Sequence, residues 1–355
     1  MNSTSANILF AAWDSARRQL GESLDFLGLR PIETPSRTLW SSPLATLKSY
    51  PSTHSAAPVL LIVPAPIKQA YIWDLIPSFS AVRRCMDGGF RLYLIRWEPP
   101  GMREQDVGLA DYADRVILGC LNAIEAVTGQ RTAFLAGHSL GGTLAAIFAA
   151  LHPERVSGLV LLEAPLSFSA GTNAFDPLIH AIGNVVILTN RVGNIPGTLL
   201  DIIAVTASPT TFVWGRYLDY LTSILDAECL QTHLLVERWL LDEMPLARRF
   251  FEEIVEWLYR DDCFMQRRLT IAGRAARPEH IDAPIVSVAE PASRIVPAAS
   301  ILPFHDAVGS DDTVVFWYGG DRGVSLQHVG PLVGRRAHQH LWPRILSWLG
   351  ERAAR

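Results

Sequence analysis

The pattern of apolar residues along the first half of the chain alternates between two kinds of segment. Short, continuous apolar runs that end at glycine or proline are typical of buried parallel strands. Longer segments with apolar residues at helical spacing separate them. We expect strands at 57–66, 90–97, 133–136 and 157–165, and helices at 71–89, 109–129 and 143–153. This order of strand, helix and strand predicts a mainly parallel sheet with helices on both faces, an α/β fold.

The rhythm breaks between residues 166 and 280, where the pattern is mostly helical, and strand patterns return at 283–290 and 313–320. The last segment, from residue 340 onward, is again helical. We therefore expect three parts: an N-terminal helical or extended segment, one α/β core made of two stretches, and a helical cap inserted between them. Their boundaries are 1–50 for the N-terminal segment, 51–165 and 281–355 for the core, and 166–280 for the cap.

Composition excludes several classes of function. The 355 residues carry a formal net charge of −4, which predicts no basic surface for nucleic acid. The four cysteines are scattered, so neither a zinc site nor a disulfide framework is expected, and a cytoplasmic location fits. No histidine has a partner at metal-ligand spacing. The sequence also has no run of 18 apolar residues, the length needed to span a membrane. We expect no metal and no cofactor.

The stretch AFLAGHSLGGTLAA (133–146) carries the strongest chemical signal. Here Gly137-x-Ser139-x-Gly141 lies where an expected strand becomes an expected helix, which is the context of a nucleophile elbow. Such a turn exposes the serine oxygen and aims the amide of Leu140 at a substrate carbonyl oxygen. The second oxyanion donor should come from the loop after the 57–66 strand, where Pro66 has no amide hydrogen and Ile67 or Lys68 is the better candidate.

Several segments, taken in order, resemble the polyhydroxyalkanoate synthases over roughly residues 55–350. The most specific are HVGPLVGRRAH (328–338) and the segment that begins VERWLLDEMP at 236. The resemblance implies an α/β hydrolase fold with a cap, and transfer of a hydroxyacyl group from coenzyme A to a polyester. It also implies a triad of cysteine, aspartate and histidine, in which His328 matches the histidine.

Two positions depart from that family pattern. Ser139 stands in the place of the cysteine, and Ser293 in the place of the aspartate, within EPASRIVP (290–297). A serine cannot carry the negative charge that stabilises an imidazolium. Our favoured replacement is Glu163, at the carboxyl end of the strand that follows the nucleophile helix, where α/β sheets assemble their sites. The alternatives are a nearby acid such as Glu290 or Asp306, and a triad with no acid.

The combined reading is a serine ester or thioester hydrolase that acts through an acyl-serine on acyl or hydroxyacyl substrates, including acyl-CoA. The catalytic set is Ser139, His328 and Glu163. The first alternative is a polyhydroxyalkanoate synthase or hydroxyacyl-CoA acyltransferase. The second is a catalytically impaired protein that binds acyl-CoA or polyester granules. The oligomeric state stays open, with a homodimer among the states considered.

Overall fold

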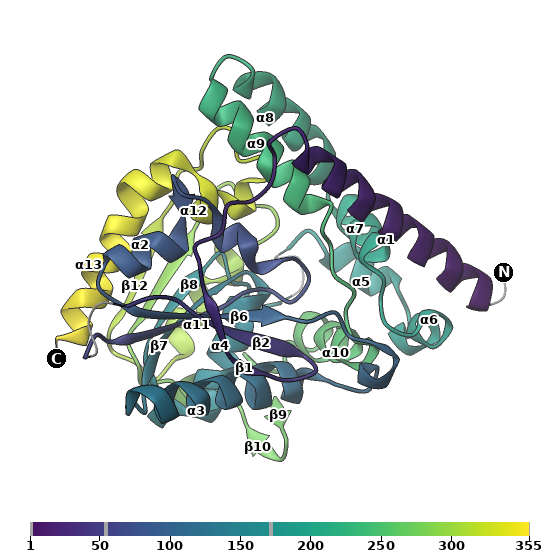
Figure 1. Ribbon diagram of the computed structural model, residues 1–355. Coiled ribbons are helices and arrows are strands. Elements are labelled where there is room, and N and C mark those ends of the chain that lie inside the picture. The colour runs from purple at the N-terminus through teal and green to yellow at the C-terminus, as the bar shows by residue number, and fades with distance from the viewer. Residues whose placement is uncertain (1–2, 53–55, 170–172, 355) are drawn as a thin grey trace.

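The computed structural model describes residues 3–52, 56–169 and 173–354, and eight strands in these residues form one sheet (Figure 1). The strand order is β1-β2-β6-β3-β7-β8-β11-β12. From β6 to β12 neighbouring strands are parallel, whereas β2 is antiparallel to both β1 and β6. The strands are β1 (Arg37–Ser41), β2 (Ala45–Ser49), β3 (Val59–Val63), β6 (Arg91–Trp97), β7 (Ala133–His138), β8 (Val156–Leu162), β11 (Ile285–Ala289) and β12 (Thr313–Trp317). The predicted α/β class is confirmed.

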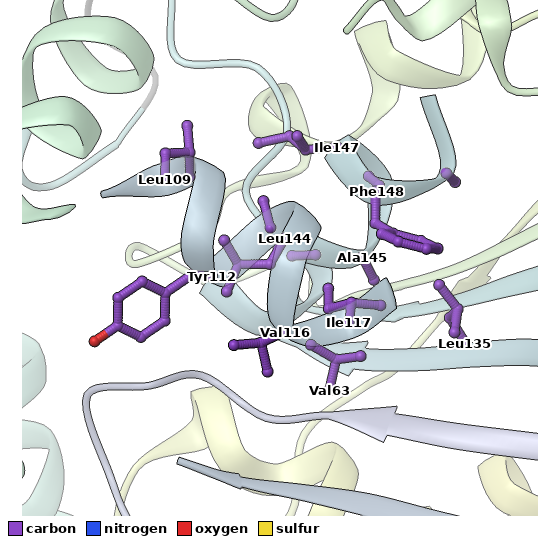
Figure 2. Packing of buried hydrophobic residues seen from close by; sticks show 14 of the residues in the cluster. Val63, Leu109, Tyr112, Val116, Ile117, Leu135, Leu144, Ala145, Ile147 and Phe148 are labelled. Atoms are coloured by element: carbon purple, nitrogen blue, oxygen red, sulfur yellow. The ribbon is translucent and has the colours of Figure 1, made fainter. Parts of the chain in front are cut away.

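The strands are apolar on both faces because helices cover both. In β3, Leu61 and Val63 pack on one side of the sheet, and Leu60 and Ile62 pack on the other. On the first side lie α3 (Val116–Thr128) and α4 (Leu140–Leu151), and Figure 2 shows Ile117 and Leu144 close to Val63. On the second side lie α2, α12 and α13, which span Ala81–Asp87, Gly330–Val333 and Trp342–Ala353. Each fully buried aliphatic side chain contributes about 1.5–3 kcal/mol.

The expected helix over 71–89 is wrong in its first half. That stretch holds a short turn at Ala70–Trp73, a two-stranded sheet of β4 (Asp74–Ile76) and β5 (Phe79–Ser80), and then α2. Pro77 lacks the amide hydrogen that a helix interior needs. The buried Asp74 carboxylate also accepts bonds from the Thr34 amide and the Ser80 hydroxyl, which hold the extended form.

Most helices of the segment between β8 and β11 lie beside the carboxyl ends of the strands (Figure 1). We call residues 166–280 the cap. Its α-helices are α5 (Asp176–Ala181), α6 (Val185–Val192), α7 (Gly197–Ala207), α8 (Arg216–Ser223), α9 (Ala227–Leu240) and α10 (Arg248–Glu253). A hairpin of β9 (Thr270–Ile271) and β10 (Arg274–Ala275) follows, and α11 (Leu302–Ala307) comes after β11.

The N-terminal region reaches both the cap and the sheet. Helix α1 (Ser3–Asp25) lies along the cap, where the Asp14 carboxylate accepts bonds from the amide and hydroxyl of Thr198 at the start of α7 (Figure 1). Strands β1 and β2, for which the sequence pattern predicted no place in the sheet, extend it at one edge. Among the described helices, none is both long enough and apolar enough to cross a bilayer.

Candidate active site

Ser139 lies at a sharp turn between β7 and α4. Its φ of 53° and ψ of −133° place it in a region that non-glycine residues seldom adopt. The Ser139 amide donates to the Leu162 carbonyl of β8 at 2.9 Å, which anchors the turn to the neighbouring strand. Strain of this kind is typical of a nucleophile elbow, because the turn presents the hydroxyl above the sheet.

The two flanking glycines are required by close backbone contacts. A Cβ on Gly137 would lie 2.5 Å from the Cα of Gly142, and a Cβ on Gly141 would lie 2.1 Å from the carbonyl oxygen of Val63. Backbone atoms cannot move away as a flexible side chain can, so both positions exclude larger residues. The glycines therefore allow β7, α4 and the end of β3 to meet at the serine.

Both predicted oxyanion donors lie beside this turn. Leu140 is the first residue of α4, so its amide has no acceptor within the helix. Ile67 lies on the loop after β3, and this loop is held from the cap: the Met244 amide donates to the Ile67 carbonyl at 3.1 Å. The next residue, Lys68, pairs with Glu243 at 2.8 Å. Leu140 and Ile67 both line the cavity that contains Ser139.

His328 lies in a short 3-10 turn, Gln327–Val329, and lines the same cavity as Ser139. Burial lowers the pKa of His328 to about 4, so the ring is a neutral base. His138, next to the serine, donates from Nε2 to the His328 carbonyl at 2.7 Å, and the two rings lie 4.6 Å apart. Burial lowers the pKa of His138 to about 3. His138 therefore holds the backbone of His328 without charging the site.

Glu163 follows directly after β8 and is fully buried, with a φ of 46°. Its Oε1 accepts a hydrogen bond from the Glu290 amide, and its Oε2 lies 3.7 Å from Nδ1 of His328. That separation is longer than a hydrogen bond, and among the described residues neither of these two buried atoms has a hydrogen-bond partner. Burial raises the pKa of Glu163 to about 8, against hydrogen bonds from Ser293 and Glu290 that favour its ionised form.

The alternative acids have different surroundings. Glu290 is buried beside Glu163; burial and the Glu163 charge raise its pKa, and its amide is what contacts Glu163. Asp306 lies on α11 beyond β11, and it is not among the residues that line the cavity of Ser139. The Ser293 side chain, in the position that matches the synthase aspartate, lies near Glu163 and lowers the pKa of that carboxyl, against the larger effect of burial. The structure thus brings together Ser139, His328, Glu163 and Ser293.

A cavity of about 230 Å³ is lined by Ser139 and His328 and extends to the cap. Its wall is mainly apolar, and the cap supplies aromatic side chains that sequence analysis did not single out as site residues: Phe175, Phe212, Trp239, Phe251 and Tyr259. Their spacing along the cap gave no signal, because their shared surface exists only once the cap helices pack over the sheet. A wall of this kind suits an acyl chain. The described residues hold no group of three or more His, Cys, Asp or Glu that could bind a metal ion.

Comparisons with known proteins agree with this geometry. A family model for the alpha/beta hydrolase fold matches residues 58–182. The solved structure of a hydrolase from Pseudomonas aeruginosa PA01 aligns with a TM-score of 0.54 at 18% identity, covering 89% of this chain and 98% of that one. The enol-lactonase from Burkholderia xenovorans LB400 also aligns with a TM-score of 0.54, at 12% identity, covering 89% of this chain and 100% of that one. These structures share the fold.

Curated relatives match over most of the chain. A poly(3-hydroxyalkanoate) polymerase subunit PhaC of Haloferax mediterranei is 29% identical over 325 residues, which are 90% of this chain and 65% of that protein. The subunit of the same name from Allochromatium vinosum is 24% identical, covering 94% of this chain and 95% of that protein. The chain is thus an enzyme of the α/β hydrolase fold, and its similarity to polyhydroxyalkanoate synthases is confirmed along most of its length.

Proposed function

We propose that the chain is a serine ester or thioester hydrolase that acts on acyl or hydroxyacyl substrates through an acyl-serine. In this proposal Ser139 is the nucleophile, His328 the general base, and Glu163 the acid that stabilises the histidine. The observation that carries it is the arrangement at one cavity: a strained serine turn, a buried neutral histidine, and a carboxylate 3.7 Å from that histidine's Nδ1.

The proposed acylation begins when the Ser139 oxygen attacks the carbonyl carbon and its proton passes to His328. The C–O bond to the serine forms, and negative charge collects on the carbonyl oxygen, where the amides of Leu140 and Ile67 would donate hydrogen bonds. The carbon–leaving-group bond then breaks, and His328 returns the proton to the departing oxygen or sulfur. Water repeats these steps in reverse to release the acid and free the serine.

Glu163 would act when His328 becomes positively charged. An imidazolium in a buried site needs an anion at its far nitrogen, or the transition state loses several kcal/mol. Because burial raises the pKa of Glu163 to about 8, its ionised fraction grows as the pH rises toward that value. Activity should therefore increase with pH on the acid side of about 8. Catalytic hydrogen bonds often shorten only when the transition state forms, which accommodates the 3.7 Å separation.

Hydrolysis is favoured by the nucleophile itself. A thiolate exchanges readily with a thioester, whereas a serine ester lies lower in free energy than a thioester and is usually resolved by water. The second candidate function is acyl transfer to a hydroxyl acceptor, as in polyester synthesis. It is favoured by the polymerase names of the relatives over most of the chain.

The test is labelling by a fluorophosphonate probe, which reacts with activated serines, in the wild type and in Ser139→Ala. We expect labelling that the substitution abolishes, together with turnover of p-nitrophenyl esters. Assays with 3-hydroxybutyryl-CoA then separate the two candidates: free acid indicates hydrolysis, and polymer indicates transfer. Intact folding without labelling or turnover would overturn the proposal in favour of a binding protein.

A further inference from the structure

The loop that carries the candidate base is held by the cap. We call residues 323–328, which end at His328, the histidine loop. The Asp219 carboxylate on α8 accepts hydrogen bonds from the Gly323 amide at 2.9 Å and the Ser325 amide at 2.8 Å. It also accepts a bond from Nδ1 of His233 on α9 at 2.8 Å. Asp219 is buried, so these three donors supply the hydrogen bonds that water would otherwise make to its carboxylate.

A second contact joins the same loop to the cavity wall. The Ser325 hydroxyl donates to Oε1 of Glu237 on α9, and Nε of Arg216 on α8 donates to that oxygen at 2.9 Å. Arg216 also lines the cavity that contains Ser139. A substrate in this cavity would therefore lie against a side chain that is linked, through Glu237 and Ser325, to the loop of His328.

The histidine loop depends on these contacts because its own conformation is unfavourable. Ser325 has a φ of 57° and Gly323 a φ of 74°, and a Cβ on Gly323 would lie 2.4 Å from the Cys229 carbonyl oxygen. A non-glycine residue in the left-handed region costs on the order of 1–3 kcal/mol and persists where its surroundings determine it. Asp219 supplies such surroundings by binding two amides on either side of Val324.

We infer that Asp219 is a positioning residue for the reaction, which sets the place of the His328 ring by holding the histidine loop from the cap. The inference rests on the proposed function, because it takes His328 to be the base. It makes the α8–α9 hairpin part of the catalytic assembly as well as a cover over the cavity. A displacement of about 1 Å at a catalytic group can lower a rate about 100-fold, so a loosened loop should be visible in turnover.

The matched control is Asp226, on the same hairpin. Its carboxylate caps α9 by accepting from the amides of Glu228 and Cys229, and it pairs with Arg335 at 3.1 Å. Asp226 does not line the cavity of Ser139. Asp226→Ala therefore removes a carboxylate and helix stability from this hairpin, while it leaves the hydrogen bonds of Asp219 and Glu237 to the histidine loop in place.

The experiment measures Asp219→Ala and Asp226→Ala, each alone and combined with His328→Ala. The readouts are kcat and KM for a p-nitrophenyl ester, the rate of fluorophosphonate labelling of Ser139, and Tm. We expect Asp219→Ala to lower kcat about 10- to 100-fold with KM within about twofold, since it displaces the base and leaves the cavity. Combined with His328→Ala, it should slow labelling no further, because Asp219 acts through His328. Asp226→Ala should stay within about twofold of the wild type.

Three results would overturn the inference: equal losses of kcat in the two aspartate variants, an Asp219→Ala effect confined to KM, or the same fold-loss with and without His328. If Asp219→Ala does not fold, Asp219→Asn decides the question. Asparagine keeps the size of the side chain and one acceptor oxygen, but its NH2 group cannot accept from the Gly323 or Ser325 amide; we expect a threefold to tenfold loss of kcat, and no loss would contradict the inference. A wild type that lacks Ser139-dependent labelling would instead be a failure of the proposed function.

Discussion

The nucleophile elbow and the histidine loop are built in opposite ways. At the elbow, strand, turn and helix are consecutive in sequence, and two glycines allow the backbones of β7, α4 and β3 to meet. The histidine loop has no regular element of its own at residues 323–326, and it is fixed by Asp219 and Glu237, about a hundred positions earlier, together with His138. The elbow is determined locally, whereas the place of His328 is determined by the whole fold.

This difference extends to electrostatics. The environment of Ser139 is made by backbone geometry, and a hydroxyl is neutral. The other end of the site holds three buried titratable groups, Glu163, Glu290 and His328. Burial and the Glu163 charge raise the pKa of Glu290, and the Glu163 carboxylate lies 3.7 Å from Nδ1 of His328. Under the proposed function, a short motif specifies the nucleophile, while the acid can lie on a different strand as long as its carboxylate approaches the histidine.

The largest loss of stability and activity should come from a substitution at the nucleophile elbow itself. Gly141→Ala places a methyl group 2.1 Å from the Val63 carbonyl oxygen, and that backbone lies in the centre of the sheet. We expect a loss of about 3 kcal/mol or more in unfolding free energy, and loss of all activity. The control is Gly350→Ala on α13, where no atom lies within 4 Å of the added Cβ and alanine favours the helix. Similar urea midpoints for the two variants would contradict the packing argument.

Removal of the Glu163 charge should impair catalysis but keep the fold. Glu163→Gln retains the size and the acceptor for the Glu290 amide, but not the charge. We expect kcat for ester hydrolysis to fall about 100- to 10,000-fold, the upper value being the loss when the acid of a serine triad is made neutral. Adding Ser293→Asp should recover part of the rate, since Ser293 and His328 line the same second cavity. A double variant as slow as Glu163→Gln would show that an aspartate at 293 cannot reach the histidine.

The same substitution should stabilise the protein at alkaline pH. Burial raises the pKa of Glu163 from its ordinary 4.5 to about 8, so the carboxyl lowers stability progressively as the pH rises from about 4.5 to about 8. Glu163→Gln lacks this loss and should unfold with a free energy ~2–4 kcal/mol above the wild type at pH 8.5, with a smaller gain at pH 6.5. Urea unfolding at both pH values measures it. A gain that is equal at both, or a loss at pH 8.5, would refute the assigned shift.

The smallest effect should come from Ser293→Ala. The Ser293 hydroxyl favours ionised Glu163 through its hydrogen bond, so its removal should raise the pKa of Glu163 slightly and shift the acid limb of kcat/KM to higher pH. We expect kcat at pH 9 to change less than about threefold. A pH–rate profile of each protein from pH 6 to 10 measures this, and a loss as large as that of Glu163→Gln would mean that Ser293 has a direct part in catalysis.

Sequence analysis predicted the parts of the molecule that depend on neighbours in the chain. The runs at 57–66 and 133–136 gave strands because their residues are buried on both faces, and the Gly137-x-Ser139-x-Gly141 spacing gave the turn. The first half of the helix expected over 71–89 was wrong because Asp74 takes its partners from Thr34 and Ser80, and the spacing of apolar residues does not indicate such partners. Asp219 was missed for the same reason: its two amide partners lie more than a hundred residues away.

The central claim is that Glu163, and no other acid, serves His328. The most direct test compares the rate of fluorophosphonate labelling of Ser139 at pH 9 in the wild type, Glu163→Gln and Glu290→Gln. Both substitutions remove a buried carboxylate from the same place, but only that of Glu163 lies 3.7 Å from Nδ1 of His328. We predict labelling at least about 100-fold slower in Glu163→Gln and within about threefold of the wild type in Glu290→Gln. Slow labelling in Glu290→Gln, with an unchanged rate in Glu163→Gln, would contradict the account and assign the acid to Glu290.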